Sequence, residues 1–243
     1  MQYNTVVNGY NVSAQYDDRN VNEIFIPLLR HLQQLSAHRA ERVIAFIAAP
    51  PAAGKSTLVN FLADLADKLS DMPPVQALGM DGFHYHQQYI LSHTVRRGGE
   101  EIPMIRVKGA PDTFDAVRLR DTLTALRKND LLWPAYDRTL HDVVEGAIPV
   151  TAPIVLAEGN YLLLDQPVWR DLTHDYAVFI SADEALLRKR LIARKMRGDK
   201  THEQAELFYR ESDGPNVQLC LNSHLPCDLE LELLPNGIFK IRS

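Results

Sequence analysis

One stretch of sequence decides the fold: residues 42–57, which read RVIAFIAAPPAAGKST. After Arg42 the stretch is a continuous apolar run to Ala49, the length of a strand that is covered on both faces of a parallel sheet. Pro, Ala and Gly at 50–54 predict a tight loop, and a helix follows to about residue 69. A buried strand, a short loop and a helix in this order indicate an α/β protein.

The loop in this stretch follows a phosphate-binding pattern. Residues 49–56 match the P-loop G-x-x-x-x-G-K-[ST], except that Ala49 stands at the first glycine. Because Ala49 carries a Cβ, we expect its backbone not to need a positive φ. Backbone amides at a helix N-terminus bind polyphosphate, a lysine meets the β and γ oxygens, and a serine helps to hold Mg²⁺. The predicted nucleotide site is Pro51, Ala52, Ala53, Gly54, Lys55, Ser56 and Thr57.

The rest of the chain alternates between apolar runs and helical spacings. Strands that alternate with helices predict a doubly wound parallel sheet in a three-layer α/β/α fold. We expect an N-terminal extension, a hairpin and a helix, at 1–40, and the main domain at 41–243. The expected elements are a hairpin at 3–16 turning at Asn8-Gly9, a helix at 20–37, strands at 75–80, 154–164 and 176–180, an irregular segment at 85–110, helices at 111–128, 183–197 and 201–211, a β excursion at 133–150 and a hairpin at 227–242.

Composition excludes several classes of function. The chain has 243 residues and a net charge of −5, which gives no overall attraction to nucleic acid or to anionic lipid. Its longest apolar run, near 43–53, is far short of a membrane span. The N-terminus lacks the pattern of a signal peptide, and there are two cysteines, Cys220 and Cys227. We therefore expect a cytoplasmic protein with neither nucleic acid nor membrane as partner.

Two acidic residues follow predicted strands near the loop. Glu158 ends a buried run, where a carboxylate is costly unless it meets a cation or hydrogen-bond donors, so we expect it to hold Mg²⁺ with Ser56. Asp81 follows the strand at 75–80 and should lie at the carboxyl edge of the sheet, where ligands bind in such folds. The alternatives are a solvent-facing Glu158 and an Asp81 that only caps a turn.

Motifs along residues 42–216 resemble the phosphoribulokinase/uridine kinase family, which includes bacterial pantothenate kinases. The likeness is greatest to a nucleoside/nucleotide kinase-like subgroup, some members of which carry fructokinase-type names. As a set, the motifs are specific for this branch, and none alone names a substrate. They are Gly54–Thr57, Met80–His84, Lys108–Asp115, Pro134-x-Tyr136-Asp137-Arg138-x-x-His141, Glu158-Gly159 and Arg190-Leu191-x-x-Arg194.

The resemblance implies a role for each matching position. Asp81 would act as general base on the acceptor hydroxyl or orient it, with Lys55, Arg190 and Arg194 as the other catalytic residues. The two arginines would close over the phosphates from a lid at about 188–212. The alternative for the segment with Tyr136 and His141 is a polar surface turn, and the alternative for the two arginines is a solvated basic helix face. The residues implied at the acceptor are His84, Tyr136, Arg138 and His141.

One departure from the family pattern concerns the acceptor. Uridine kinases carry an aspartate that grips ribose where this chain has Gly109, which makes uridine and cytidine doubtful. We expect Mg²⁺-dependent transfer of the γ-phosphoryl group of ATP to a hydroxyl of a small metabolite such as a sugar, a nucleoside or a pantothenate-like compound. The alternative is a P-loop ATPase or a nucleotide-binding regulatory protein. The sequence leaves open which acceptor is used, whether the nucleotide is ATP or GTP, and whether the protein forms a homodimer.

Overall fold

The computed structural model describes residues 1–7, 9–198 and 200–242, so Asn8 of the predicted turn and Asp199 of the predicted lid lie outside the described residues. Over these ranges the main sheet has six strands in the order β12-β11-β10-β3-β9-β4. All neighbouring pairs are parallel except β11 with β12. Doubly wound sheets are mostly parallel and often carry one antiparallel strand at an edge. The strands are β3 (Val43–Ala48), β4 (Val75–Gly79), β9 (Ile154–Gly159), β10 (Tyr176–Ala182), β11 (Leu229–Leu233) and β12 (Phe239–Ile241).

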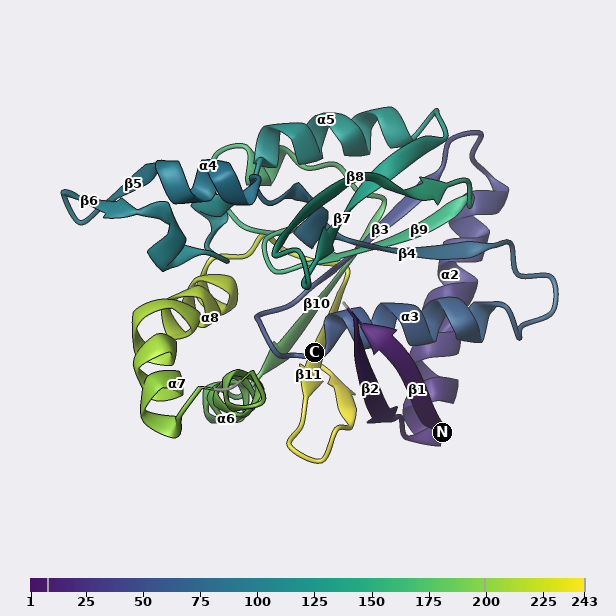
Figure 1. Cartoon of the computed structure of the whole chain (residues 1–243). Helices are drawn as coiled ribbons and strands as arrows, with labels where there is room; N and C mark the ends of the chain where they lie inside the picture. Colours follow the sequence, from purple (N-terminus) through teal and green to yellow (C-terminus); the bar gives the residue numbers. More distant parts are fainter. Residues whose placement is uncertain (8, 199, 243) are drawn as a thin grey trace.

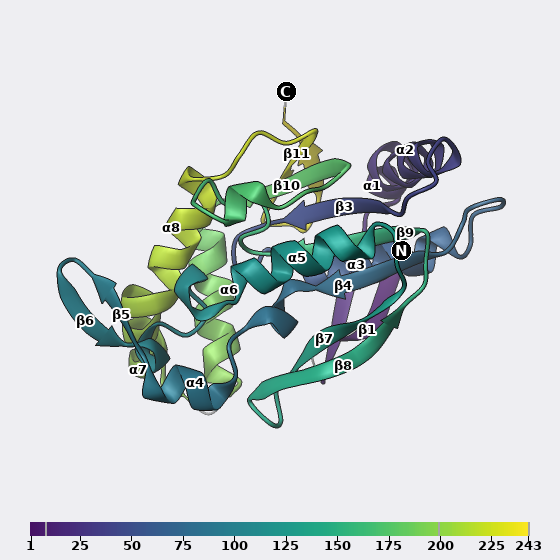
Figure 2. The same ribbon diagram turned by 90° about the horizontal axis from the view of Figure 1, so that it is seen from above.

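Helices cover both faces of this sheet, so the predicted three-layer α/β/α fold is confirmed (Figures 1 and 2). Along β3, Val43, Ala45 and Ile47 face one apolar cluster, and the alternate residues face the other. The first cluster includes residues of α2, α3 and α6, and the second includes residues of α5. The helices are α1 (Asp18–Asn20), α2 (Ile26–Ala37), α3 (Lys55–Ala66), α4 (Gln87–Ser92), α5 (Ala116–Leu126), α6 (Glu184–Met196), α7 (His202–Phe208) and α8 (Gly214–Asn222).

Among the described residues, three antiparallel hairpins lie outside the main sheet. The first packs on α3 (Figure 1). Tyr3 donates a hydrogen bond to Asp64 at 2.7 Å, and the ring centres of Tyr16 and Phe61 are 4.2 Å apart. The predicted packing of the N-terminal segment on the main domain is therefore present, while the domain boundary at residue 40 stays a prediction. The hairpins are β1 (Gln2–Val7) with β2 (Tyr10–Gln15), β5 (Thr94–Arg97) with β6 (Glu100–Pro103), and β7 (Leu131–Asp137) with β8 (Asp142–Val150).

Three expected elements differ from the structure. The segment at 85–110 is not irregular throughout, because it holds α4 and the β5–β6 hairpin. The helix expected from residue 111 begins at Ala116, because Asp115 caps it by accepting from the backbone N–H of Arg118. The strand expected to residue 164 ends at Gly159, since the apolar residues after it pack through a turn. No helix in the described ranges has the length and apolar character needed to cross a membrane.

Candidate active site

The loop between β3 and α3 exposes its backbone at the carboxyl edge of the sheet. Ala52 and Gly54 have φ values of +65° and +89°, and consecutive amides around such left-handed residues form an anion-binding concavity. Gly54 is the residue immediately before α3, so the helix N-terminus opens into the same loop. Ala49 lies outside the left-handed region, which confirms the prediction about its backbone. Pro51, Ala53 and Thr57 of the predicted nucleotide site are buried.

Glu158 meets the loop from the adjacent strand. The Ser56 hydroxyl donates a 2.6 Å hydrogen bond to Glu158 Oε1, and Lys55 Nζ lies 3.9 Å from Oε2. Glu158 is only 8% exposed, and burial raises the pKa of its carboxyl while Lys55 opposes that rise. The site therefore offers a hydroxyl oxygen and a carboxylate, which fits Mg²⁺ bound partly by nucleotide phosphates and water. No cluster of three or more His, Cys, Asp or Glu side chains suited to a metal occurs in the described ranges.

Asp81 stands beside this pair at the end of the next strand. Gly79 of β4 is in register with Glu158, and the 3₁₀ turn Met80–Phe83 follows directly. The Asp81 carboxylate is near enough to raise the pKa of Glu158, and it keeps partial contact with solvent. Arg138 Nη2, from the β7–β8 turn, lies 3.9 Å from Asp81 Oδ2. The fold thus brings Asp81, Glu158 and the loop to one edge, as the sequence predicted.

His84 and Tyr136 lie together next to Asp81. Their rings are 5.3 Å apart, and His84 Nδ1 lies 2.9 Å from the carbonyl oxygen of Asp81, which can only accept. Burial lowers the pKa of His84, so the ring is neutral at pH 7. Lys108 donates to the Tyr136 hydroxyl at 2.8 Å and to the carbonyl of His141 at 3.2 Å. For His141, no hydrogen bond of the imidazole occurs among the described residues, so its role stays a prediction.

Two arginines of α6, Arg190 and Arg194, lie one helical turn apart, and the first contacts the loop. Arg190 Nη1 donates to the carbonyl of Ala52 at 3.2 Å, which attaches α6 to the nucleotide loop. Arg194 is exposed to water, yet surrounding protein lowers its pKa, and the charges of Asp213, Arg138 and Asp81 all act on it. The structure thus places Arg190 at the loop, while the role of Arg194 stays a prediction.

Two residues near the site were missed by the sequence reading. Lys108 belongs to one of the family-like motifs, and its ammonium group fixes the Tyr136 hydroxyl. Asp213 is buried, with Lys195 Nζ 3.9 Å from its Oδ2. The sequence signal for the buried position of Asp213 was an aspartate followed by Gly-Pro within a helical pattern.

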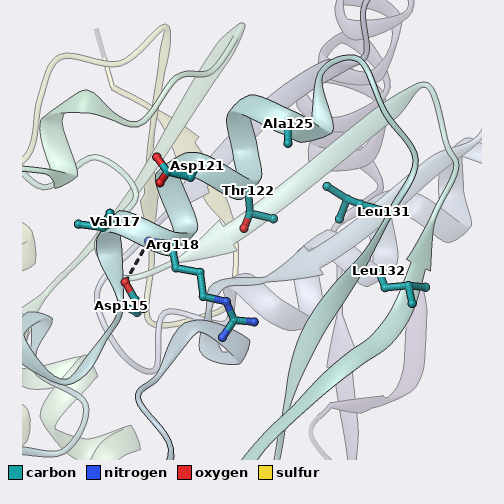
Figure 3. Close-up of a pocket in the computed structure, with 8 residues that line it drawn as sticks. All are labelled: Asp115, Val117, Arg118, Asp121, Thr122, Ala125, Leu131 and Leu132. Carbon is teal, nitrogen blue, oxygen red and sulfur yellow. Dashed lines mark hydrogen bonds between the residues drawn. The ribbon is translucent and has the colours of Figure 1, made fainter.

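A separate hollow of about 540 Å³ lies between α5 and β7 (Figure 3). Its lining includes Asp115, Arg118 and Leu132, and none of the predicted site residues. The hollow is therefore not part of the candidate active site.

The chain is similar in sequence to several proteins of other organisms. The chain is 39% identical over 246 residues to the uncharacterized protein YggC of Escherichia coli, covering 100% of both chains. It is 29% identical to a Schizosaccharomyces pombe protein named "Putative uridine kinase", covering 70% of each. It is 25% identical to a pantothenate kinase of Enterococcus faecalis, with 73% of this chain and 62% of that one covered. No protein-family model matches the chain.

Solved structures agree with these relatives. A crystal structure from Silicibacter sp. TM1040, titled as a "putative fructose transport system kinase", shares 30% identity and a TM-score of 0.70. The match covers 82% of this chain and 98% of that one. The chain belongs to the phosphoribulokinase/uridine kinase/bacterial pantothenate kinase family of P-loop kinases and is a phosphotransferase with an alcohol group as acceptor.

Proposed function

We propose that this protein transfers the γ-phosphoryl group of ATP to a hydroxyl group of a small metabolite. The observation that carries this proposal is the 2.6 Å hydrogen bond from Ser56 to Glu158. It lies next to the loop that holds the left-handed residues Ala52 and Gly54, and beside Asp81. Phosphoryl transfer needs little covalent help from a protein and depends on positioning and on charge. A phosphate cradle, a cation and two separated carboxylates at one sheet edge are the parts that such a transfer uses.

Each residue has one task in this proposal. The amides of Pro51–Thr57 bind the phosphates, and Lys55 balances charge on the β and γ oxygens. The acceptor oxygen bonds to the γ-phosphorus as the bond from that phosphorus to the β–γ bridging oxygen breaks, and ADP leaves. Asp81 orients the acceptor hydroxyl and takes its proton.

Ser56 and Glu158 would hold Mg²⁺, which when bound neutralises charge on the phosphates. Arg190 and Arg194 lie one helical turn apart on α6, within the lid that we place at about 188–212, and Arg190 donates to the loop carbonyl of Ala52. Cations at these positions oppose the negative charge of the transferring group.

The acceptor side is formed by His84, Tyr136, Arg138 and the turn that carries His141. A neutral imidazole, a phenol and a guanidinium beside Asp81 can bind a polyhydroxylated molecule or one that also carries an acid. The named relatives include kinases for uridine and for pantothenate. Gly109 has no side chain to grip a ribose, and its carbonyl accepts a hydrogen bond from Tyr161 at 2.7 Å. This favours a sugar or a pantothenate-like acceptor over uridine.

A screen of ADP release across sugars, nucleosides, pantothenate and glycerate tests the proposal. We expect ADP formation to depend on the acceptor and on Mg²⁺. Lys55→Met and Asp81→Asn should each lower kcat by at least about 10²-fold, the scale of losing one positioned electrostatic group.

Lys68→Met and Asp67→Asn are matched controls, because both side chains are exposed just beyond the end of α3. They should retain normal turnover. ADP release without any acceptor would indicate an ATPase, and ATP binding without transfer to any acceptor would indicate a regulatory protein. Normal turnover by Asp81→Asn would remove the base assignment.

A further inference from the structure

A buried carboxylate next to the lid helix has no part in the chemistry above. Asp213 is 8% exposed, and its Oδ2 accepts no hydrogen bond from the residues that the structure describes. Burial raises the pKa of the Asp213 carboxyl, and the charges of Lys195 and Arg194 oppose that rise. The cation on this oxygen is Lys195, whose Nζ lies 3.9 Å away.

The backbone turns Asp213 inward by an irregularity in the helix. Residues 202–222 run through α7, a π-helical turn at Tyr209–Asp213 and α8. Pro215 in the first turn of α8 has no N–H to donate, and the N–H of Gly214 bonds to the carbonyl of Tyr209. A Cβ on Gly214 would lie 3.0 Å from that carbonyl oxygen. A π turn inserts one residue and re-aims side chains, and such turns are frequent at functional sites.

The lid helix is attached to this segment by several contacts. Arg188 of α6 pairs with Glu206 of α7, and Lys195 Nζ lies 3.5 Å from the centre of the Phe208 ring. Tyr209 donates a hydrogen bond to Glu184 at 3.2 Å. In Figures 1 and 2, α6 lies beside α7 and α8. Asp213 is therefore fixed relative to α6 along most of the length of that helix.

Arg194 is next to Lys195 and one helical turn after Arg190, whose Nη1 donates to the carbonyl of Ala52 at 3.2 Å, so the two arginines share the face of α6 that is turned toward the nucleotide loop. The charges of Asp213 and of Asp81 both act on Arg194, with Arg138 opposing them. The contact of Asp213 with Lys195 fixes this end of α6 against the helical segment that carries Asp213.

We propose that Asp213 is a positioning residue that, through its contact with Lys195, holds Arg194 where the γ-phosphate of ATP will lie. This inference rests on the proposed function, because it assumes that a triphosphate occupies the loop. Asp213 touches neither substrate and acts through the two cations of α6.

The direction in which Asp213→Asn changes nucleotide affinity distinguishes a positioning role from a purely electrostatic effect. Removing a negative charge near a triphosphate strengthens its binding if only electrostatics count. If Asp213 positions Arg194, Asp213→Asn instead weakens binding of the ATP analogue AMP-PNP with Mg²⁺. We expect a loss of about tenfold, the scale of one charge-assisted hydrogen bond. ADP, which lacks the γ-phosphate, should lose less than about twofold by the same reasoning.

Isothermal titration calorimetry with AMP-PNP and ADP measures these changes on the full chain. Glu211→Gln is the matched control, because this carboxylate is exposed on the same π turn, and it should bind both nucleotides as the wild type does. Lys195→Met should reproduce the loss from the other partner, which also covers the case in which Asp213→Asn does not fold. In an Arg194→Gln background, Asp213→Asn should have no further effect on AMP-PNP.

Three results would overturn the inference. Unchanged or tighter AMP-PNP binding by Asp213→Asn would exclude positioning, and so would equal losses for AMP-PNP and ADP. A loss that persists in the Arg194→Gln background would show that Asp213 does not act through Arg194. In each of these cases wild-type binding leaves the proposed function standing, whereas a wild type that binds neither nucleotide overturns both.

Discussion

Glu158 is a carboxylate inside a parallel sheet, and its neighbours determine what it costs. Ser56 donates a hydrogen bond to it and Lys55 lies 3.9 Å away, yet burial still raises the pKa of its carboxyl. A raised folded-state pKa means that the native state binds the proton more tightly than the unfolded chain does. The ionised form therefore costs stability at neutral pH, and a cation arriving with a nucleotide would offset that cost.

Glu158→Gln should raise the melting temperature of the nucleotide-free protein at pH 7 while it abolishes phosphoryl transfer. The Gln amide oxygen still accepts from Ser56, and the buried charge is gone. The stability gain should be complete above the raised folded-state pKa and should vanish as pH falls below the ordinary glutamate pKa, because the wild type then takes up a proton. Thermal unfolding of both proteins across this pH range measures the difference in melting temperature. A difference that does not change with pH would contradict the burial argument.

At the scale of the element, the turn that carries Asp81 is set by close backbone packing. A Cβ added to Gly82 would lie 2.0 Å from the carbonyl oxygen of Pro134 in β7. Trp133, also in β7, donates its indole N–H to the carbonyl of Gly79 at 2.9 Å. Pro134 cannot donate to β8, and the strand pairing shifts at this point. The hairpin thus fixes the turn after β4, and Asp81 with it.

Gly82→Ala should destabilise the fold by about 1–3 kcal/mol, as overpacking does, and lower turnover by displacing Asp81. Urea denaturation gives the first quantity and ADP release the second. Gly198→Ala is the control for stability, because its Cβ would meet only the carbonyl oxygen of Lys195 at an ordinary 3.6 Å. Equal stability of the two alanine variants would show that the Pro134 contact relaxes without cost.

These elements also show what sequence reasoning can reach. The loop at 50–54, β3 and the start of a helix near residue 201 follow from local patterns, and the structure has them all. The β5–β6 hairpin was missed because a four-residue strand pair is too short to show a period. The environments of Lys108 and Asp213 were missed because they depend on segments distant in sequence, which no local pattern describes.

At the scale of the whole molecule, the N-terminal segment joins the end of the chain to the helix that carries the nucleotide loop. Tyr16 and Phe25 pack against Phe61 of α3 and against Phe239 of β12. Asn20 is 5% exposed, and its amide bonds to both backbone groups of Phe239, at 2.7 and 2.8 Å. The segment at 1–40 therefore shares one apolar core with the sheet and α3.

Asn20→Ala should lower the free energy of unfolding by about 1–3 kcal/mol, because it leaves a buried backbone N–H and carbonyl of Phe239 without partners. Asn22→Ala is the matched control, since Asn22 is exposed and bonds only to the carbonyl of Asp18 in its own helical segment, and it should change stability by less than about 0.5 kcal/mol. Urea denaturation followed by fluorescence compares the two. If the extension and the main domain unfold as one unit, the Asn20 variant keeps a single transition at lower urea. A separate early transition would mean that residues 1–40 unfold without the sheet, and that the shared aromatic core does not couple them.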